Sequence, residues 1–112
     1  MAQIRTAAPR REASIQSAIL RYLKSLGRHC RTFNVHGNAW QGAGEPDIHA
    51  CYRGRMIVIE VKRPGEKPTK LQEHALRKWA EAGAVTMVAT SVEDVRKMIE
   101  AIGSRVEGVC RE

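Results

Sequence analysis

The stretch GEPDIHACYRGRMIVIEVK, Gly44–Lys62, decides the fold of this chain. It contains two strand-like runs, Asp47–Tyr52 and Arg55–Val61, which are joined by the dipeptide Arg53-Gly54. Two such runs separated by a short glycine-containing connection predict a β-hairpin. Two carboxylates and a lysine interrupt the apolar pattern. Burying a charged group costs free energy unless the group is paired, so these residues need a specific explanation.

The register of this hairpin predicts where the charged residues meet. If the turn has two residues, Asp47 lies directly opposite Glu60, and opposed residues share a face of the sheet with their Cβ atoms about 5 Å apart. Lys62 shares that face because side chains alternate along a strand, whereas Ile59 and Val61 point into the core. Two carboxylates and an ammonium group are therefore expected at one end of the hairpin.

Opposed like charges destabilise a sheet, so the two carboxylates need a compensating group. A divalent cation is one candidate, because Mg²⁺ commonly binds one or two carboxylates and leaves its other positions to water and phosphate. The alternative is a purely structural salt-bridge cluster of Asp47, Glu60 and Lys62.

The apolar spacing of the remaining chain predicts an α/β fold with the order α-β-β-β-α-β-α, a mixed sheet flanked by helices. The helix between the third and fourth strands is a crossover, which makes these two strands parallel. The expected elements besides the hairpin are a helix from Glu12 that ends at Gly27, a strand at Arg31–Val35, a helix from Thr69 to Gly83 with Leu71, Ala75, Leu76, Trp79 and Ala82 on one side, a strand at Ala84–Ala89 and a helix after Ser91.

The domain organisation follows from length and composition. At 112 residues, of which 43% are hydrophobic, the chain is expected to form one domain over residues 11–112, preceded by a flexible basic arm at residues 1–10. Residues 36–44 are expected to form a glycine-rich loop in which Trp40 packs on the sheet. No apolar run has the length of a membrane span or a secretory signal, so we expect a soluble, intracellular protein. Its three cysteines, without a C-x-x-C pair, are expected to be reduced, and the His and Cys spacing does not suggest zinc.

The charge balance favours a polyanionic partner. Nineteen Lys and Arg residues against twelve Asp and Glu residues give a formal net charge of +7, and the basic residues are spread along the chain. Two tryptophans, two tyrosines and one phenylalanine are too few for a base-stacking platform, so contacts with nucleic-acid phosphates are expected instead.

The charged residues of the hairpin also carry a family resemblance. Pro46-Asp47 followed by Glu60-Val61-Lys62 resembles the PD-(D/E)xK nuclease signature. The preceding helix with its early glutamate, the glycine-rich loop and the following helix with Gln72 resemble the virus-type replication-repair nuclease (VRR-NUC) domain in particular. This resemblance covers Glu12 to Ile102 and implies a restriction-endonuclease-like fold.

The resemblance implies a role for each residue of the site. Asp47, Glu60, the carbonyl of Val61 and the helix-borne Glu12 would be metal ligands for Mg²⁺ or Mn²⁺. Lys62 would position or deprotonate the attacking water, and Gln72 would occupy the place of the family's active-site glutamine. A bound metal lowers the pKa of water, and a lysine beside the nucleophile stabilises developing negative charge.

Structural alternatives remain for several of these residues. A glutamate in a first helical turn favours the helix dipole, which would account for Glu12, and Thr69 with Gln72 matches a capping box. Glu45 is expected to stay in solvent rather than join Asp47, and His49 to be packed rather than catalytic.

The resemblance implies a metal-dependent DNA endonuclease that acts as a homodimer on branched DNA such as four-way (Holliday) junctions, in a phage or mobile-element setting. The alternatives are a DNA-binding module of the same fold that does not cut, and a hydrolase of another phosphate ester. An intact set of Glu12, Asp47, Glu60 and Lys62 argues against the first of these alternatives.

Overall fold

The computed structural model describes residues 2–34 and 44–110, with side chains described at 11–33 and 44–104. The predictions made for the loop at residues 36–44, including the packing of Trp40, lie almost entirely outside the described residues. Within the described ranges, no helix combines the length and apolarity needed to cross a bilayer.

The observed element order confirms the predicted α-β-β-β-α-β-α arrangement. The helices are α1 (Ala2–Ser25), α2 (Lys70–Glu81) and α3 (Val92–Cys110), the strands are β1 (Cys30–Asn34), β2 (Ile48–Tyr52), β3 (Arg55–Val61) and β4 (Val85–Ala89), and a short 3₁₀ helix, η1 (Gly27–His29), follows α1. The strand and helix bounds after α1 agree with the predicted ones to within one or two residues, and Ser91 accepts a hydrogen bond from the Asp94 N–H at the start of α3 (3.2 Å).

The four strands form one mixed sheet in the order β1-β2-β3-β4. The pairs β1/β2 and β2/β3 are antiparallel, and β3/β4 is parallel, as the crossover through α2 predicts. The hairpin turn consists of Arg53 (φ 51°) and Gly54 (φ 84°). Positive φ at both central residues is the mark of a type I′ turn, whose twist matches that of the flanking strands. The turn therefore sets the register in which Tyr52 pairs with Arg55.

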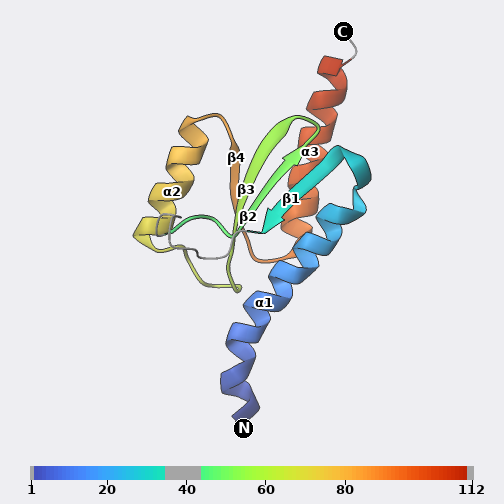
Figure 1. Cartoon of the computed structure of the whole chain (residues 1–112). Helices are drawn as coiled ribbons and strands as arrows, with labels where there is room; N and C mark the ends of the chain where they lie inside the picture. Colours follow the sequence, from blue (N-terminus) through green and yellow to red (C-terminus); the bar gives the residue numbers. More distant parts are fainter. Residues whose placement is uncertain (1, 35–43, 111–112) are drawn as a thin grey trace.

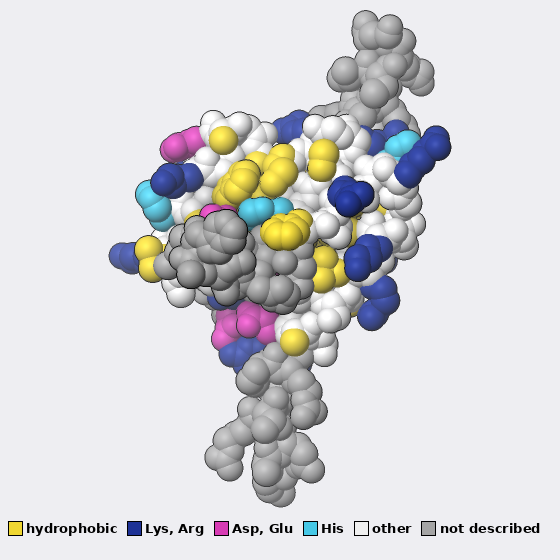
Figure 2. Space-filling view, in the orientation of Figure 1, with side chains coloured by type: hydrophobic (Ala, Val, Ile, Leu, Met, Phe, Trp, Pro, Cys, Tyr) yellow, Lys and Arg dark blue, Asp and Glu magenta, His cyan; other side chains and the backbone are white. Residues whose placement is uncertain are grey.

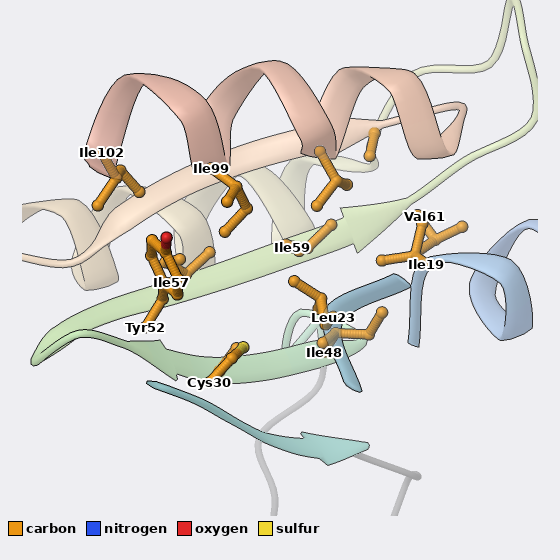
Figure 3. Packing of buried hydrophobic residues seen from close by; sticks show 13 residues of the cluster. Ile19, Leu23, Cys30, Ile48, Tyr52, Ile57, Ile59, Val61, Ile99 and Ile102 are labelled. Carbon is orange, nitrogen blue, oxygen red and sulfur yellow. The ribbon is translucent and has the colours of Figure 1, made fainter. Parts of the chain in front are cut away.

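Helices cover both faces of the sheet (Figure 1), with α1 and α3 on one face and α2 on the other. The main hydrophobic core lies between the sheet and the α1/α3 layer (Figure 3). Alternate residues of β2 and β3 point into it because side chains alternate across a strand. The buried members of this core are Ile19, Leu23, Cys30, Ile48, Ala50, Tyr52, Ile57, Ile59, Val61, Ala89, Val95, Ile99 and Ile102.

The first helix begins ten residues earlier than predicted. Residues 2–11 lack an apolar periodicity, which led to the prediction of an arm before Glu12, but they continue α1 without a break. This half of α1 projects beyond the sheet (Figure 1), so it needs no apolar face. Its alanines, including Ala7 and Ala8, have a high intrinsic helix propensity. The predicted absence of helix is therefore wrong, whereas the predicted flexibility of residues 1–10 stays a prediction.

The inward face of α2 also differs from the prediction, at both ends of the predicted apolar side. Leu71 and Ala82, both expected on the apolar side, are exposed, Leu71 to 58%. The half-buried positions are Gln72, Ala75, Leu76 and Trp79, which repeat with helical spacing. Because Gln72 rather than Leu71 faces inward, the first turn of α2 presents a polar side chain where the pattern suggested an apolar one.

Candidate active site

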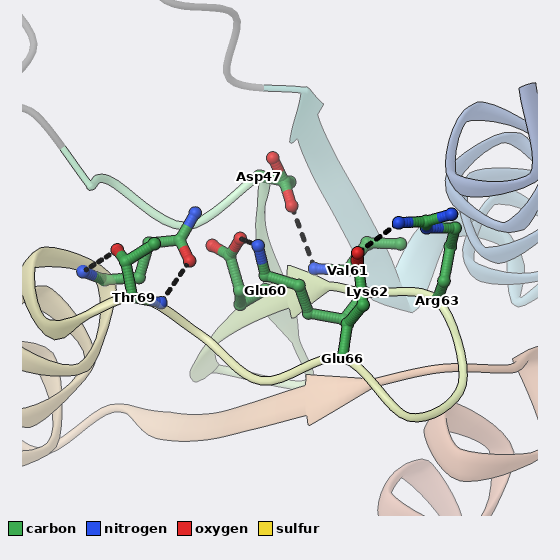
Figure 4. A network of polar contacts seen from close by, with 8 residues as sticks. Asp47, Glu60, Val61, Lys62, Arg63, Glu66 and Thr69 are labelled. Carbon is green, nitrogen blue, oxygen red and sulfur yellow. Dashed lines mark hydrogen bonds and ion pairs between the residues drawn. The ribbon is translucent and has the colours of Figure 1, made fainter. Parts of the chain in front are cut away.

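The open end of the β2–β3 hairpin brings Asp47 and Glu60 together. Ile48 pairs with Ile59, so the next residues outward, Asp47 and Glu60, lie opposite each other just beyond the first pair of β2. The Oδ2 atom of Asp47 accepts a hydrogen bond from the backbone N–H of Val61 at 2.8 Å (Figure 4). The predicted convergence of the two carboxylates is confirmed.

Glu60 is the buried charged residue of the described core, with only 2% of its surface exposed. Its Oε1 atom is buried and has no hydrogen-bond partner among the described residues. Burial, reinforced by the neighbouring charge of Asp47, raises the pKa of Glu60 to about 8, and the smaller opposing effect comes from Lys62. The protein alone therefore favours the protonated form of Glu60.

Lys62 only partly compensates this burial. Its Nζ atom lies 3.7 Å from Glu60 Oε2, which is within ion-pair range when Glu60 is charged but longer than a hydrogen bond. The backbone N–H of Lys62 donates to the Ala89 carbonyl at 3.0 Å, which joins the residue to β4. The predicted salt-bridge cluster thus exists in part, yet it leaves the second oxygen of Glu60 without a partner.

The carbonyl of Val61 faces the same region. Peptide groups along a strand point alternately to its two neighbours. Lys62 bonds to β4, so Val61 directs its N–H and C=O toward the opposite side, where its N–H meets Asp47. The orientation is compatible with the predicted ligand role of the Val61 carbonyl.

These groups fit a divalent cation. Carboxylate oxygens and a backbone carbonyl are the hard ligands that Mg²⁺ and Mn²⁺ prefer. A cation beside Asp47 and Glu60 would give the buried Oε1 atom a partner and relieve the repulsion that raises the pKa of Glu60. Among the described residues, no three His, Cys, Asp or Glu side chains gather as one metal-binding group, so the pair of carboxylates is the centre of the candidate site.

Glu12 lies near this pair without joining it. Its charge contributes to raising the pKa of Glu60, although less than Asp47 does. The alternative interpretation, a glutamate that stabilises a first helical turn, is wrong because α1 begins at Ala2 and has no acidic residue in its first turn. The role of Glu12 as a third ligand stays a prediction.

Gln72 has the structural role that the sequence pattern predicts. Thr69 Oγ1 accepts from the Gln72 backbone N–H at 3.2 Å, and Gln72 Oε1 accepts from the Thr69 N–H at 2.8 Å. This capping box fixes the start of α2 next to Gly44. A Cβ atom on Gly44 would lie 2.7 Å from the backbone of Leu71, and the φ of Gly44 is 85°, so only glycine fits here. The cap is confirmed, and a catalytic role of Gln72 stays a prediction.

Sequence reasoning missed a polar cluster beside Asp47. The expectation that Glu45 stays in solvent is wrong, because its Oε1 atom accepts a hydrogen bond from Trp79 Nε1 at 2.8 Å. His49 Nε2 lies 3.4 Å from the same oxygen but forms no hydrogen bond, and the His49 ring packs edge-on against Trp79 with centroids 5.0 Å apart. The packed state predicted for His49 is confirmed. Continued alternation of residues 45, 47 and 49 was the signal that could have placed Glu45 on this face.

Comparison with known proteins identifies the fold. No protein-family model and no curated protein matches the chain. A solved structure named "VRR_NUC domain" is 25% identical, with a TM-score of 0.67 over 80% of this chain and 95% of that one. A second, named "VRR_NUC domain protein", shares the fold at 20% identity, with a TM-score of 0.60 over 82% of this chain and 84% of that one.

Proposed function

Because the chain has a VRR-NUC domain, which is a nuclease-type domain, we propose that it is a Mg²⁺- or Mn²⁺-dependent endonuclease that hydrolyses DNA phosphodiester bonds. One observation carries the proposal. Asp47 and Glu60 face each other beside Lys62, and one buried carboxylate oxygen has no hydrogen-bond partner among the residues that the structure describes. In a purely structural salt bridge we would expect that oxygen to accept a hydrogen bond. In a cation site the same oxygen would coordinate the metal.

Each residue of the site has a chemical task in this proposal. Asp47, Glu60 and the Val61 carbonyl would hold the metal, with Glu12 completing the set, and the bound metal would lower the pKa of water and neutralise charge on the phosphate. Lys62 keeps its ammonium group within 3.7 Å of Glu60 and so stands beside the same region. There it would orient the attacking water and stabilise the extra negative charge of the pentacovalent phosphate.

The basic surface supports DNA as the substrate. The formal net charge is +7. Figure 2 shows Lys and Arg side chains distributed around one face of the molecule rather than gathered in one pocket. This distribution suits a long polyanion better than a small phosphate ester. Near the site, Arg63 is paired with Glu66, so a phosphate contact by Arg63 would first have to break this ion pair. Lys67 and Lys70 flank the same region and, among the described residues, form no such ion pair.

Branched DNA and a homodimer complete the proposal. The resemblance to small, stand-alone VRR-NUC domains implies four-way junctions as substrates. Symmetric cleavage of a junction needs two active sites, which a twofold dimer supplies. Mass measurement of the protein in solution, alone and with a junction, tests this part separately from the chemistry.

A cleavage assay tests the proposed activity. The protein is incubated with linear duplex, flap and four-way-junction DNA, each with Mg²⁺, with Mn²⁺ and with EDTA. We expect metal-dependent strand cleavage that is fastest on the junction, and its absence in Asp47→Asn. Tight junction binding without cleavage in either metal would instead identify a DNA-binding module that does not cut.

A further inference from the structure

The segment that carries Asp47 is tied to α2 through Glu45. The Glu45 carboxylate accepts a hydrogen bond from Trp79 Nε1 at 2.8 Å in a partly buried position. Trp79 lies near the end of α2, and its ring also contacts His49 of β2. One helix therefore contacts the chain both two residues before and two residues after Asp47.

The backbone of Asp47 is constrained by the residues that precede it and not by sheet pairing. Pairing of β2 with β3 begins only at Ile48, so Asp47 is not part of the ladder. Pro46, between Glu45 and Asp47, is fully buried, and its ring fixes its φ angle. A short, stiff link of this kind transmits the position of Glu45 to Asp47.

The start of the segment rests on the same helix. Gly44 packs so closely on the first turn of α2 that a Cβ atom would lie 2.7 Å from the Leu71 carbonyl group. Gly44 thus contacts the beginning of α2, and Glu45 is bonded to Trp79 two turns further along. These two contacts set both the position and the direction of the chain as it enters β2.

We propose that Glu45 and Trp79 are positioning residues, whose hydrogen bond holds Asp47 against the N–H of Val61 and opposite Glu60. The purpose of this placement, a preorganised pair of metal ligands, rests on the proposed nuclease function. The placement itself does not, because it is a property of the protein without metal or DNA. Mutating a residue that holds a metal ligand in place typically lowers metal affinity about 10- to 100-fold.

Amide hydrogen exchange at two neighbouring residues tests the proposal directly. The Val61 N–H is held by the Asp47 side chain, whereas the Lys62 N–H is held by the Ala89 carbonyl of β4. In Trp79→Phe, which keeps a ring against His49 but lacks the N–H donor, we expect Val61 to exchange up to about tenfold faster, the equivalent of one lost hydrogen bond. Lys62 should keep its wild-type rate.

Variants at Glu45 supply matched controls. Glu45→Ala removes the acceptor and should speed up hydrogen exchange of the Val61 N–H, as Trp79→Phe does. Glu45→Gln retains an oxygen acceptor for Trp79 and should leave Val61 at its wild-type rate. An unchanged exchange rate of the Val61 N–H in both Trp79→Phe and Glu45→Ala would overturn the proposal. An equal increase in the exchange rates of Val61 and Lys62 would also overturn it, because it would indicate a general loss of stability.

A second measurement relates the Glu45–Trp79 hydrogen bond to metal binding at the candidate site. Isothermal titration with Mn²⁺ should show affinity weakened about 10- to 100-fold in Trp79→Phe and unchanged in Glu45→Gln. Wild-type protein that binds no Mn²⁺ and cuts no DNA would refute the proposed function, but the Val61 exchange rates would still decide whether Glu45 and Trp79 position Asp47.

Discussion

The two faces of β3 are both buried over residues 57–61, but they differ in chemistry. On the α1/α3 face, Ile57, Ile59 and Val61 are 0% exposed and belong to the hydrophobic core. On the α2 face, Val58 is equally buried, yet Glu60 two residues later is a carboxyl group with 2% exposure. A single strand thus serves the core with one set of side chains and the candidate site with the other.

This difference separates stability from function along one strand. Full burial of a large aliphatic side chain stabilises a fold by roughly 1.5–3 kcal/mol. Burial of Glu60 has the opposite sign, because its charged form is desolvated and repelled by Asp47. Apolar burial on the α1/α3 face therefore offsets the unfavourable burial of Glu60 on the other face of the same strand. Substitutions on the two faces should have opposite consequences.

The largest effect is expected from removing a carboxylate on the α2 face. Asp47→Asn or Glu60→Gln should lower the cleavage rate at least about 10²- to 10³-fold, because a proposed metal ligand and its charge are lost. The fold should remain intact by circular dichroism, and metal-free stability should equal or exceed that of the wild type. A folded Glu60→Gln protein that cuts at the normal rate would show that the α2 face holds no metal site.

Lys62→Ala should remove turnover with little loss of DNA binding. One lysine among nineteen basic residues contributes little to the overall attraction of phosphates, whereas its position beside Glu60 is specific. Affinity for a junction is measured in Ca²⁺, which supports binding without hydrolysis in sites of this kind, and cleavage is measured in Mg²⁺. Normal cleavage would reduce Lys62 to an ion-pair partner of Glu60.

On the opposite face, Ile59→Ala should reverse the pattern. Deleting a fully buried aliphatic side chain costs about 2–5 kcal/mol of unfolding free energy, through lost burial and the cavity left behind. The remaining folded protein should still cut at a rate close to that of the wild type. Urea unfolding and cleavage at low temperature are compared with those of Glu60→Gln. An Ile59→Ala protein as stable as the wild type would contradict the assignment of stability to the α1/α3 face and of the candidate site to the α2 face.

The pH dependence of stability isolates Glu60. Its ordinary pKa of 4.5 applies to the unfolded chain, and its pKa in the fold is about 8, so the folded state binds the extra proton between these values. The unfolding free energy in metal-free buffer should therefore fall as pH rises from about 4.5 to about 8, by on the order of a few kcal/mol. Glu60→Gln should lack this slope. The difference between the two urea-unfolding curves removes the contributions of histidines, which both proteins share, and identical slopes would contradict the raised pKa.

The smallest effect concerns the edge of the site at Gln72. Gln72→Ala should cost about 1 kcal/mol of stability by breaking the capping box with Thr69. Gln72→Glu retains a capping box and should restore stability, but the added negative charge and lost amide should still impair cleavage. Thermal unfolding and cleavage are measured for both variants. Full cleavage by Gln72→Glu would mean that Gln72 only caps α2.

The hairpin and its charged end were predictable from local sequence. The dipeptide Arg53-Gly54 admits a type I′ turn, which sets the register, and strand alternation then places Asp47 and Glu60 together. The capping box at Thr69 is equally local. In these cases a few neighbouring residues determine the geometry, so pattern and outcome agree.

Only the tertiary structure decided how the helices meet this hairpin. The sequence pattern placed the start of the first helix at Glu12, whereas α1 begins at Ala2, so Glu12 does not begin a helix. The bond from Glu45 to Trp79 joins residues 34 positions apart, and no periodicity relates them. Local rules act through backbone geometry over a few residues, whereas such contacts arise from the packing of whole elements, which the sequence by itself does not display.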